Sequence, residues 1–99
     1  MSQKEIVEIR LYAIIEGRVQ GVGFRYFVED NALSLGLRGW VRNRWDGTVE
    51  LTAEGEQQSL EKLLVAVRRG PRSSYVSNVR PEWLPATGEF RDFRIRMTS

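Results

Sequence analysis

The apolar residues of this chain are spaced as in strands in some segments and as in helices in others. The order of these segments restricts the fold more than any other feature. Residues 6–15 alternate apolar and polar side chains, which predicts a strand with one buried face. The predicted buried positions are Val7, Ile9, Leu11, Ala13 and Ile15. A glycine-rich loop follows at residues 17–23, and residues 24–35 carry apolar side chains at helical spacing until Gly36 ends the helix.

A hairpin and a second helix are predicted next. Residues 37–43 are typical of a strand, the Asp46-Gly47 pair of a hairpin turn, and residues 49–53 of a third strand that ends at Gly55. The clearest helix of the chain then occupies residues 56–71. Its apolar stripe is formed by Leu60, Leu63, Leu64 and Val67, its predicted first turn contains Glu56, and Gly70 and Pro71 end it.

The C-terminal part of the chain is predicted to be extended. Residues 74–85 favour an extended segment, although Pro81 makes it a poor central strand. Residues 92–97 predict a final strand, because Phe93, Ile95 and Met97 alternate with polar side chains.

The resulting order of elements is βαββαβ, with room for a short extra segment at the C-terminus. Each helix has a single apolar stripe, so both helices must cover one face of a four- or five-stranded antiparallel sheet. The predicted fold class is therefore α+β, a ferredoxin-like two-layer sandwich. Residues 1–99 are predicted to form a single domain. This fold occurs with many functions, so it does not by itself indicate one.

Composition excludes several kinds of active site. The chain has no histidine and no cysteine, which removes phosphohistidine and cysteinyl-phosphate chemistry, Ser–His triads and nearly all zinc sites. Acidic residues are scattered, and Glu29–Asp30 is their only adjacent pair, so no two-metal site is predicted. An enzyme with this composition is expected to use no metal and no other cofactor.

Charge and hydropathy indicate where the protein acts. Only Lys4 and Lys62 of the 15 basic residues are lysines, and arginine is the better side chain for forked binding of oxyanions. No apolar run approaches the ~20 residues of a membrane span, and the first ten residues lack the apolar core of a signal peptide. With no cysteine in the chain, we expect a cytoplasmic protein that does not associate with membranes.

The stretch GRVQGVGFR, residues 17–25, lies between the first predicted strand and the first predicted helix. At that position the loop N–H groups and the first unpaired N–H groups of the helix can converge on an anion. Arg25 falls in the first helical turn, where a cation opposes the helix dipole unless an anion is bound beside it. On spacing alone, a tight connection with an incidental surface arginine explains the stretch equally well.

The same stretch resembles the first signature of the acylphosphatase family, G-x-V-Q-G-V-x-[FM]-R. Residues 39–55, GWVRNRWDGTVELTAEG, are similar to the family's second signature. The specified positions of that signature are all met, at Gly39, Trp40, Val41, Arg42, Asn43, Gly47, Val49 and Gly55. The resemblance extends from about residue 8 to the end of the chain. It departs at residues 97–99, where family members often have an aromatic residue.

The resemblance implies a hydrolase that cleaves the carboxyl–phosphate bond of acyl phosphates by direct attack of water. Arg25 would bind the phosphate, and Asn43 would orient the water. Further donors would be the main-chain N–H groups of the loop, at Gln20, Gly21, Val22, Gly23, Phe24 and Arg25. The implied ligands are acyl phosphates and inorganic phosphate, and the implied oligomeric state is a monomer.

Two other functions are compatible with parts of the sequence. The RNA-recognition domain has the same βαββαβ order, and RGWVRNRW resembles its basic-aromatic strand motif. That motif belongs in the third strand, however, where this chain has TVELTAE, and a net charge of +2 is small for a nucleic-acid surface. The second alternative is an acylphosphatase-like domain that passes a phosphorylated or carbamoyl intermediate within a larger enzyme. Because Arg25 and Asn43 are both present, we favour the hydrolase and expect no nucleic-acid partner.

Overall fold

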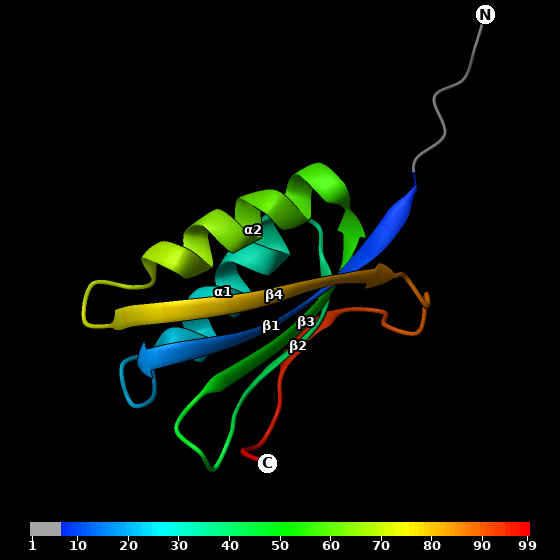
Figure 1. The fold of residues 1–99 in the computed structure, drawn as a ribbon. Coiled ribbons are helices and arrows are strands. Elements are labelled where there is room, and N and C mark those ends of the chain that lie inside the picture. Colours follow the sequence, from blue (N-terminus) through cyan, green and yellow to red (C-terminus); the bar gives the residue numbers. More distant parts are fainter. Residues whose placement is uncertain (1–6) are drawn as a thin grey trace, which may run out of the picture.

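Five strands form one sheet in the order β4-β1-β3-β2-β5, and two helices cover one of its faces (Figure 1). The computed structural model describes residues 7–99. The strands are β1 (Glu8–Arg18), β2 (Arg38–Asn43), β3 (Val49–Glu56), β4 (Tyr75–Pro85) and β5 (Phe93–Ile95), and the helices are α1 (Phe24–Ser34) and α2 (Gln57–Arg69). The predicted ferredoxin-like sandwich is thus confirmed. Neither helix in the described part of the chain is long and apolar enough to cross a membrane.

The pairs among β1, β2, β3 and β4 are antiparallel, and the pair of β5 with β2 is parallel. β1 pairs with β3 and β4, and β3 pairs with β2, all antiparallel. β4 therefore ends at the same end of the sheet at which β2 begins. Residues 86–92 cross that end, and β5 then runs beside β2 in the same direction (Figure 1). The sequence predicts antiparallel pairing throughout, and this short parallel pair departs from it because a crossover leaves no trace in local periodicity.

β4 is an edge strand, which explains how it accommodates a proline. Pro81 lies opposite Ala13 of β1, and no strand pairs with the other side of β4 in the described chain. A residue without an N–H group is tolerated at such an edge. The extended segment predicted over residues 74–85 is therefore a full strand of the sheet, placed where Pro81 does no harm.

The core lies between the sheet and the helices. Leu11, Ala13 and Ile15 of β1 are fully buried, as the alternating pattern predicts, and they pack with the apolar stripes of both helices. Val7 was expected on the same face but is 68% exposed, because β1 begins only at Glu8 and no element covers the residue before it. Ile6, also in the predicted strand, lies outside the described residues.

Other element ends differ from the predictions by a few residues. Glu56 is the N-cap of α2 rather than part of its first turn, because β3 continues through it. β5 stops at Ile95, and Met97 is 88% exposed instead of facing the core. β1 extends to Arg18, so the glycine-rich loop starts at Val19 and Gly17 belongs to the strand.

Gly17 has a packing role rather than a role in the loop. The β1–β4 register shifts between Glu16 and Gly17, and Gly17 has φ +128°. A Cβ at this position would lie 2.1 Å from the carbonyl oxygen of Tyr75. Glycine is therefore required for β4 to approach the end of β1.

Candidate active site

The loop between β1 and α1 is shaped by two glycines. Gly21 has φ +72° and Gly23, the N-cap of α1, has φ +77°. No atom lies within 4 Å of a Cβ built at either position, so backbone conformation and not crowding favours glycine there. The two glycines also leave space free in front of the loop.

That space is a cavity of about 220 Å³ between the loop, the first turn of α1 and the end of β2. Its lining residues are Val19, Gly21, Gly23, Phe24, Arg25, Tyr26 and Asn43. Five of the seven predicted site residues are among them, namely Gly21, Gly23, Phe24, Arg25 and Asn43. Residues that are far apart in the sequence, in the two signature stretches, thus meet around one cavity.

Asn43 contributes a polar atom without a partner to this cavity. It is the last residue of β2, two positions after the fully buried Val41, so its side chain lies on the helix-covered face of the sheet. Its side-chain oxygen Oδ1 is buried and accepts no hydrogen bond from any described residue. Such a buried oxygen is costly in a protein unless a ligand supplies a donor. A water molecule or a hydroxyl group is a donor of the required kind.

Arg25 brings a positive charge to the same cavity. It is the second residue of α1, its side chain is partly buried, and within residues 7–99 no carboxylate forms an ion pair with it. The first turn of α1 contains no acidic residue either. The charge of Arg25 and the positive end of the helix dipole are therefore both available to an anion.

The loop main chain adds donors beside Arg25. In the described part of the chain, none of the N–H groups from residue 20 to residue 25 donates a hydrogen bond to a protein acceptor. The carbonyl of Gly23 accepts from Phe27 and starts the helix, which leaves the N–H groups before it unpaired. A loop of this kind can surround one anion with several donors.

Gln20 and Val22, also predicted as site residues, do not line the cavity. The side-chain amide of Gln20 donates to the main-chain oxygens of Arg44 and Thr48, at 2.7 and 2.8 Å. Val22 packs against the core, and its carbonyl accepts a 3.4 Å hydrogen bond from Ser73 Oγ. Their side chains hold the loop in place, and only their main-chain N–H groups remain as candidate ligands.

Sequence reasoning missed two features of the cavity. Tyr26 lines it with a side chain that is 66% exposed, although only its neighbour Arg25 is part of the signature. Its place in the first helical turn was the available signal, since consecutive residues at a helix start surround the same helix end. The side-chain role of Gln20 had no local signal, because its partners lie 24 and 28 residues away.

The C-terminal segment supports the strand that carries Asn43. The N–H group of Arg96 donates to Val41, and that of Ser99 donates to the carbonyl of Asn43. The N–H group of Trp45 donates in turn to Ser99. These bonds need no side chain, so the departure from the family pattern at residues 97–99 leaves them in place.

The described residues include no group of three or more His, Cys, Asp or Glu side chains placed to hold a metal ion. The ligands that the cavity offers are a guanidinium, amide N–H groups and an amide oxygen. This set suits a small oxyanion with a water molecule beside it.

Comparisons with known proteins show which proteins this chain is similar to. A model of the acylphosphatase family matches residues 11–95. The chain is 51% identical over 88 residues to the acylphosphatase of Bacillus pumilus, covering 89% of this chain and 98% of that protein. Its structure is similar to that of an acylphosphatase from Coxiella burnetii, with a TM-score of 0.86, 42% identity and coverage of 97% of this chain and all of the other (100%). It is also similar to part of full-length HypF, with a TM-score of 0.87 and 27% identity, covering 98% of this chain and 13% of HypF.

Proposed function

The chain belongs to the acylphosphatase family, and on this premise we propose that it hydrolyses acyl phosphates to a carboxylate and inorganic phosphate. Arg25 and the main-chain N–H groups of residues 20–25 hold the phosphate in the cavity. Asn43 holds the attacking water. The acyl group extends toward solvent, because a cavity of about 220 Å³ encloses little more than the phosphate and the carboxyl group.

The observation that carries this proposal is the position of Asn43 Oδ1. It is a buried acceptor without a protein partner, and it lies in the wall of the cavity that Arg25 also lines. An acceptor there holds a water by one of its protons and directs the water oxygen toward a phosphate bound by Arg25. An amide is too weak a base to remove the proton, so its contribution is orientation.

The reaction transfers the phosphoryl group to water. The water oxygen forms a bond to phosphorus while the bond from phosphorus to the carboxyl oxygen breaks, and its electron pair leaves with the carboxylate. The proton that the water loses ends on the phosphate product or in solvent. In such a loose transition state, charge spreads over the equatorial phosphate oxygens, where the Arg25 fork and the loop N–H groups donate. Each donor contributes roughly 3 kcal/mol, or about 100-fold in rate.

The leaving group explains why so few side chains suffice. A carboxylate is a weak base, with a pKa of about 4, so it departs without a general acid. No histidine is needed for protonation, and the chain has none. We propose that charge stabilisation comes from Arg25 and the loop without a metal ion or another cofactor.

The two alternative functions are less well supported. For RNA binding, a base would stack on Trp40 of the RGWVRNRW segment, but this ring is only partly exposed and the guanidiniums of Arg42 and Arg96 each lie 4.7 Å from its centroid. A stacking base would have to displace them. For a domain of a larger enzyme, the likeness to HypF is the relevant observation, yet identity is higher to relatives of about this chain's length.

We also propose that residues 1–99 act as one monomeric domain in the cytoplasm. Supporting this, a single core cluster draws on β1, β2, β3, β4, β5 and both helices, and the chain contains no cysteine. Light scattering after gel filtration tests the monomer directly, since a mass of twice 11.4 kDa would contradict it.

Hydrolysis of benzoyl phosphate in ¹⁸O-labelled water tests the reaction. We expect rapid turnover in the presence of EDTA, with the label in inorganic phosphate, because water attacks phosphorus. Label in benzoate would show attack at the carboxyl carbon and overturn the mechanism. No turnover by folded protein would overturn the function.

A further inference from the structure

The face of the sheet that the helices leave uncovered has its own ordered array of side chains. Strand register places Arg80 of β4 beside Ile14 of β1, and Ile14 beside Glu50 of β3. In the next row, Glu82 of β4 lies beside Tyr12 of β1. These side chains face away from the core and from the cavity of Asn43, which lies on the helix-covered face.

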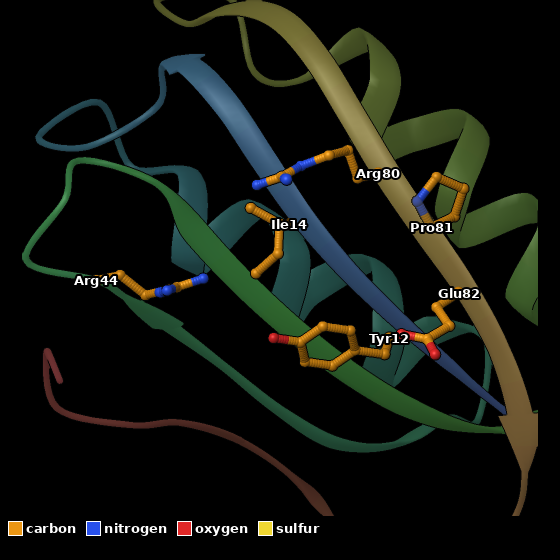
Figure 2. Close-up of a pocket in the computed structure, with 6 residues that line it drawn as sticks. All are labelled: Tyr12, Ile14, Arg44, Arg80, Pro81 and Glu82. Atoms are coloured by element: carbon orange, nitrogen blue, oxygen red, sulfur yellow. The ribbon is translucent and has the colours of Figure 1, made fainter.

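A groove of about 520 Å³ runs over these two rows (Figure 2). Its lining residues are Tyr12, Ile14, Arg44, Arg80, Pro81 and Glu82. Figure 2 shows Arg44 and Arg80 reaching from opposite sides toward Ile14, while Glu82 lies near Tyr12 at the other end. The volume is within the range of small-molecule sites, roughly 300–1,000 Å³.

The two arginines of the groove differ from other arginines of this face. Arg10 donates to Glu54 at 2.7 Å and Arg42 donates to Glu50 at 2.6 Å, both within hydrogen-bond distance. Arg44 is 3.6 Å from its nearest carboxylate, Asp46, and Arg80 is 3.9 Å from Glu16. Within the described chain, neither guanidinium of the groove donates a hydrogen bond to a carboxylate.

The acids nearest to these two arginines are engaged by closer donors. Asp46 Oδ1 accepts from the N–H and hydroxyl groups of Thr48, at 3.0 and 2.6 Å, whereas Arg44 lies 3.6 Å from the other oxygen, Oδ2. Glu16 accepts from Asn78 at 2.8 Å. An added anion would therefore not have to break a short arginine–carboxylate bond.

Glu50, the buried acid closest to the groove floor, is also fully engaged. Its two carboxylate oxygens accept from Tyr12 Oη at 2.5 Å and from Arg42 at 2.6 Å. Burial by itself raises the pKa of Glu50, but these two bonds and the charges of Arg42 and Arg44 outweigh burial and hold the pKa below its usual value. Within residues 7–99, Arg42 is the arginine that donates to Glu50, so neither groove arginine is hydrogen-bonded to this carboxylate.

We propose that this groove is a second binding site, for a small organic anion. A carboxylate or phosphate group binds between Arg44 and Arg80, and an aromatic or similar apolar body lies on Ile14. Glu82 repels a second negative charge and so fixes the orientation. The groove shares no lining residue with the cavity around Arg25, and binding there does not rest on the proposed function.

The test is a titration of ¹⁵N-labelled protein with benzoate and with phenyl phosphate, followed by NMR. We expect saturable shifts at the amides of residues 12–14 and 80–82 and at the side-chain Nε–H groups of Arg44 and Arg80. In the double variant R44Q/R80Q, affinity falls by about tenfold or more, because two charge-assisted hydrogen bonds are lost. The main-chain carbonyl of residue 44 remains, so the bond from Gln20 is kept.

Matched controls test whether binding depends on these two arginines and on a ligand that is both charged and organic. Arg91→Gln removes an exposed arginine from the segment between β4 and β5, and affinity should not change. Benzyl alcohol, the neutral analogue, and inorganic phosphate should each bind at least tenfold more weakly here than phenyl phosphate. The single variant Arg80→Gln serves if the double variant does not fold.

Three results would overturn the proposal. One is equal affinity in R44Q/R80Q and the wild type. Another is benzyl alcohol or inorganic phosphate binding as tightly as the organic anions. The third is shifts confined to residues 20–25, which would mean that both probes bind only in the cavity around Arg25.

Discussion

The side chain of Gln20 donates a 2.7 Å hydrogen bond to the main-chain carbonyl of Arg44, the residue that follows Asn43. A second bond, 2.8 Å long, reaches the carbonyl of Thr48 across the hairpin. One side chain thus ties the glycine loop to the turn between β2 and β3. These two bonds hold the glycine loop in place relative to Asn43.

Gln20→Ala should lower kcat more than it weakens phosphate binding. Loss of both bonds lets the loop and the hairpin move apart, and misplaced reacting groups cost roughly 10- to 100-fold in rate. Two hydrogen bonds are also lost, although the carbonyls of Arg44 and Thr48 each keep a main-chain donor, so the free energy of unfolding should fall by about 1–3 kcal/mol. Steady-state kinetics and urea unfolding measure the two effects. Gln57→Ala, which removes an exposed amide from α2, should change neither, and normal kcat in Gln20→Ala would contradict the positioning role.

Arg25→Gln should strongly lower turnover and weaken inhibition of the remaining activity by inorganic phosphate. The change removes the positive charge and the fork at the cavity, and the expected loss in kcat/KM is about 100-fold or more. Arg25→Lys keeps a point charge but not the planar fork, so only part of the activity should return. If the inhibition constant of inorganic phosphate were the same for Arg25→Gln as for the wild type, the phosphate would be held by other groups.

Gly23→Ala separates conformational strain from crowding. The Cβ would meet no atom within 4 Å, but φ +77° costs a non-glycine residue about 1–2 kcal/mol. Gly88→Ala is a matched control, since Gly88 has φ +73° and equally free space but lies outside the cavity. Both variants should lose similar stability in urea unfolding, whereas only Gly23→Ala should lose activity. Equal activity in the two variants would show that loop shape does not matter for the reaction.

Glu54 should make stability depend on acid pH. Burial alone raises its pKa, but hydrogen bonds from the Thr87 and Gly88 N–H groups and from Arg10 outweigh burial and hold the pKa below the usual value of 4.5. The folded state therefore favours the ionised carboxylate. The resulting stability is complete above pH 4.5 and is lost as the pH falls through the lowered pKa of the folded state.

Urea unfolding between about pH 3 and pH 7, the range over which carboxyl groups titrate, measures this dependence. Glu54→Gln should be less stable at neutral pH and should flatten the acid limb of the stability curve. Glu61→Gln, on the exposed side of α2, should leave the curve unchanged. An unaltered acid limb in Glu54→Gln would assign the dependence to other groups.

The elements of the fold could be predicted because each has a local pattern. The alternation around Leu11 and the stripe containing Leu60 are both buried as predicted. The predicted strands are too long where the alternating pattern continues beyond the residues that other elements cover. Val7 and Met97 both fit a strand pattern, yet both are exposed because no neighbouring element covers them.

Only part of the candidate site could be predicted from the sequence. Motif resemblance identified Arg25 and Asn43, and the structure brings both to one cavity. No pattern along the chain indicates that Asn43 Oδ1 is buried without a partner, because its surroundings come from residues about 20 positions earlier in the sequence. The groove between Arg44 and Arg80 was likewise hidden, since strand register decides which side chains on the uncovered face become neighbours.

One paired measurement decides whether Asn43 orients water for attack on a phosphate held by Arg25. The kcat for benzoyl phosphate and the inhibition constant of inorganic phosphate are measured in the presence of EDTA, for wild type, Asn43→Ala and the exposed-residue control Asn78→Ala. We expect Asn43→Ala to lose about 100-fold or more in kcat while phosphate inhibition is unchanged, since only the water is released. If Asn43→Ala turned over benzoyl phosphate as fast as the wild type and Asn78→Ala, Asn43 would not orient the water.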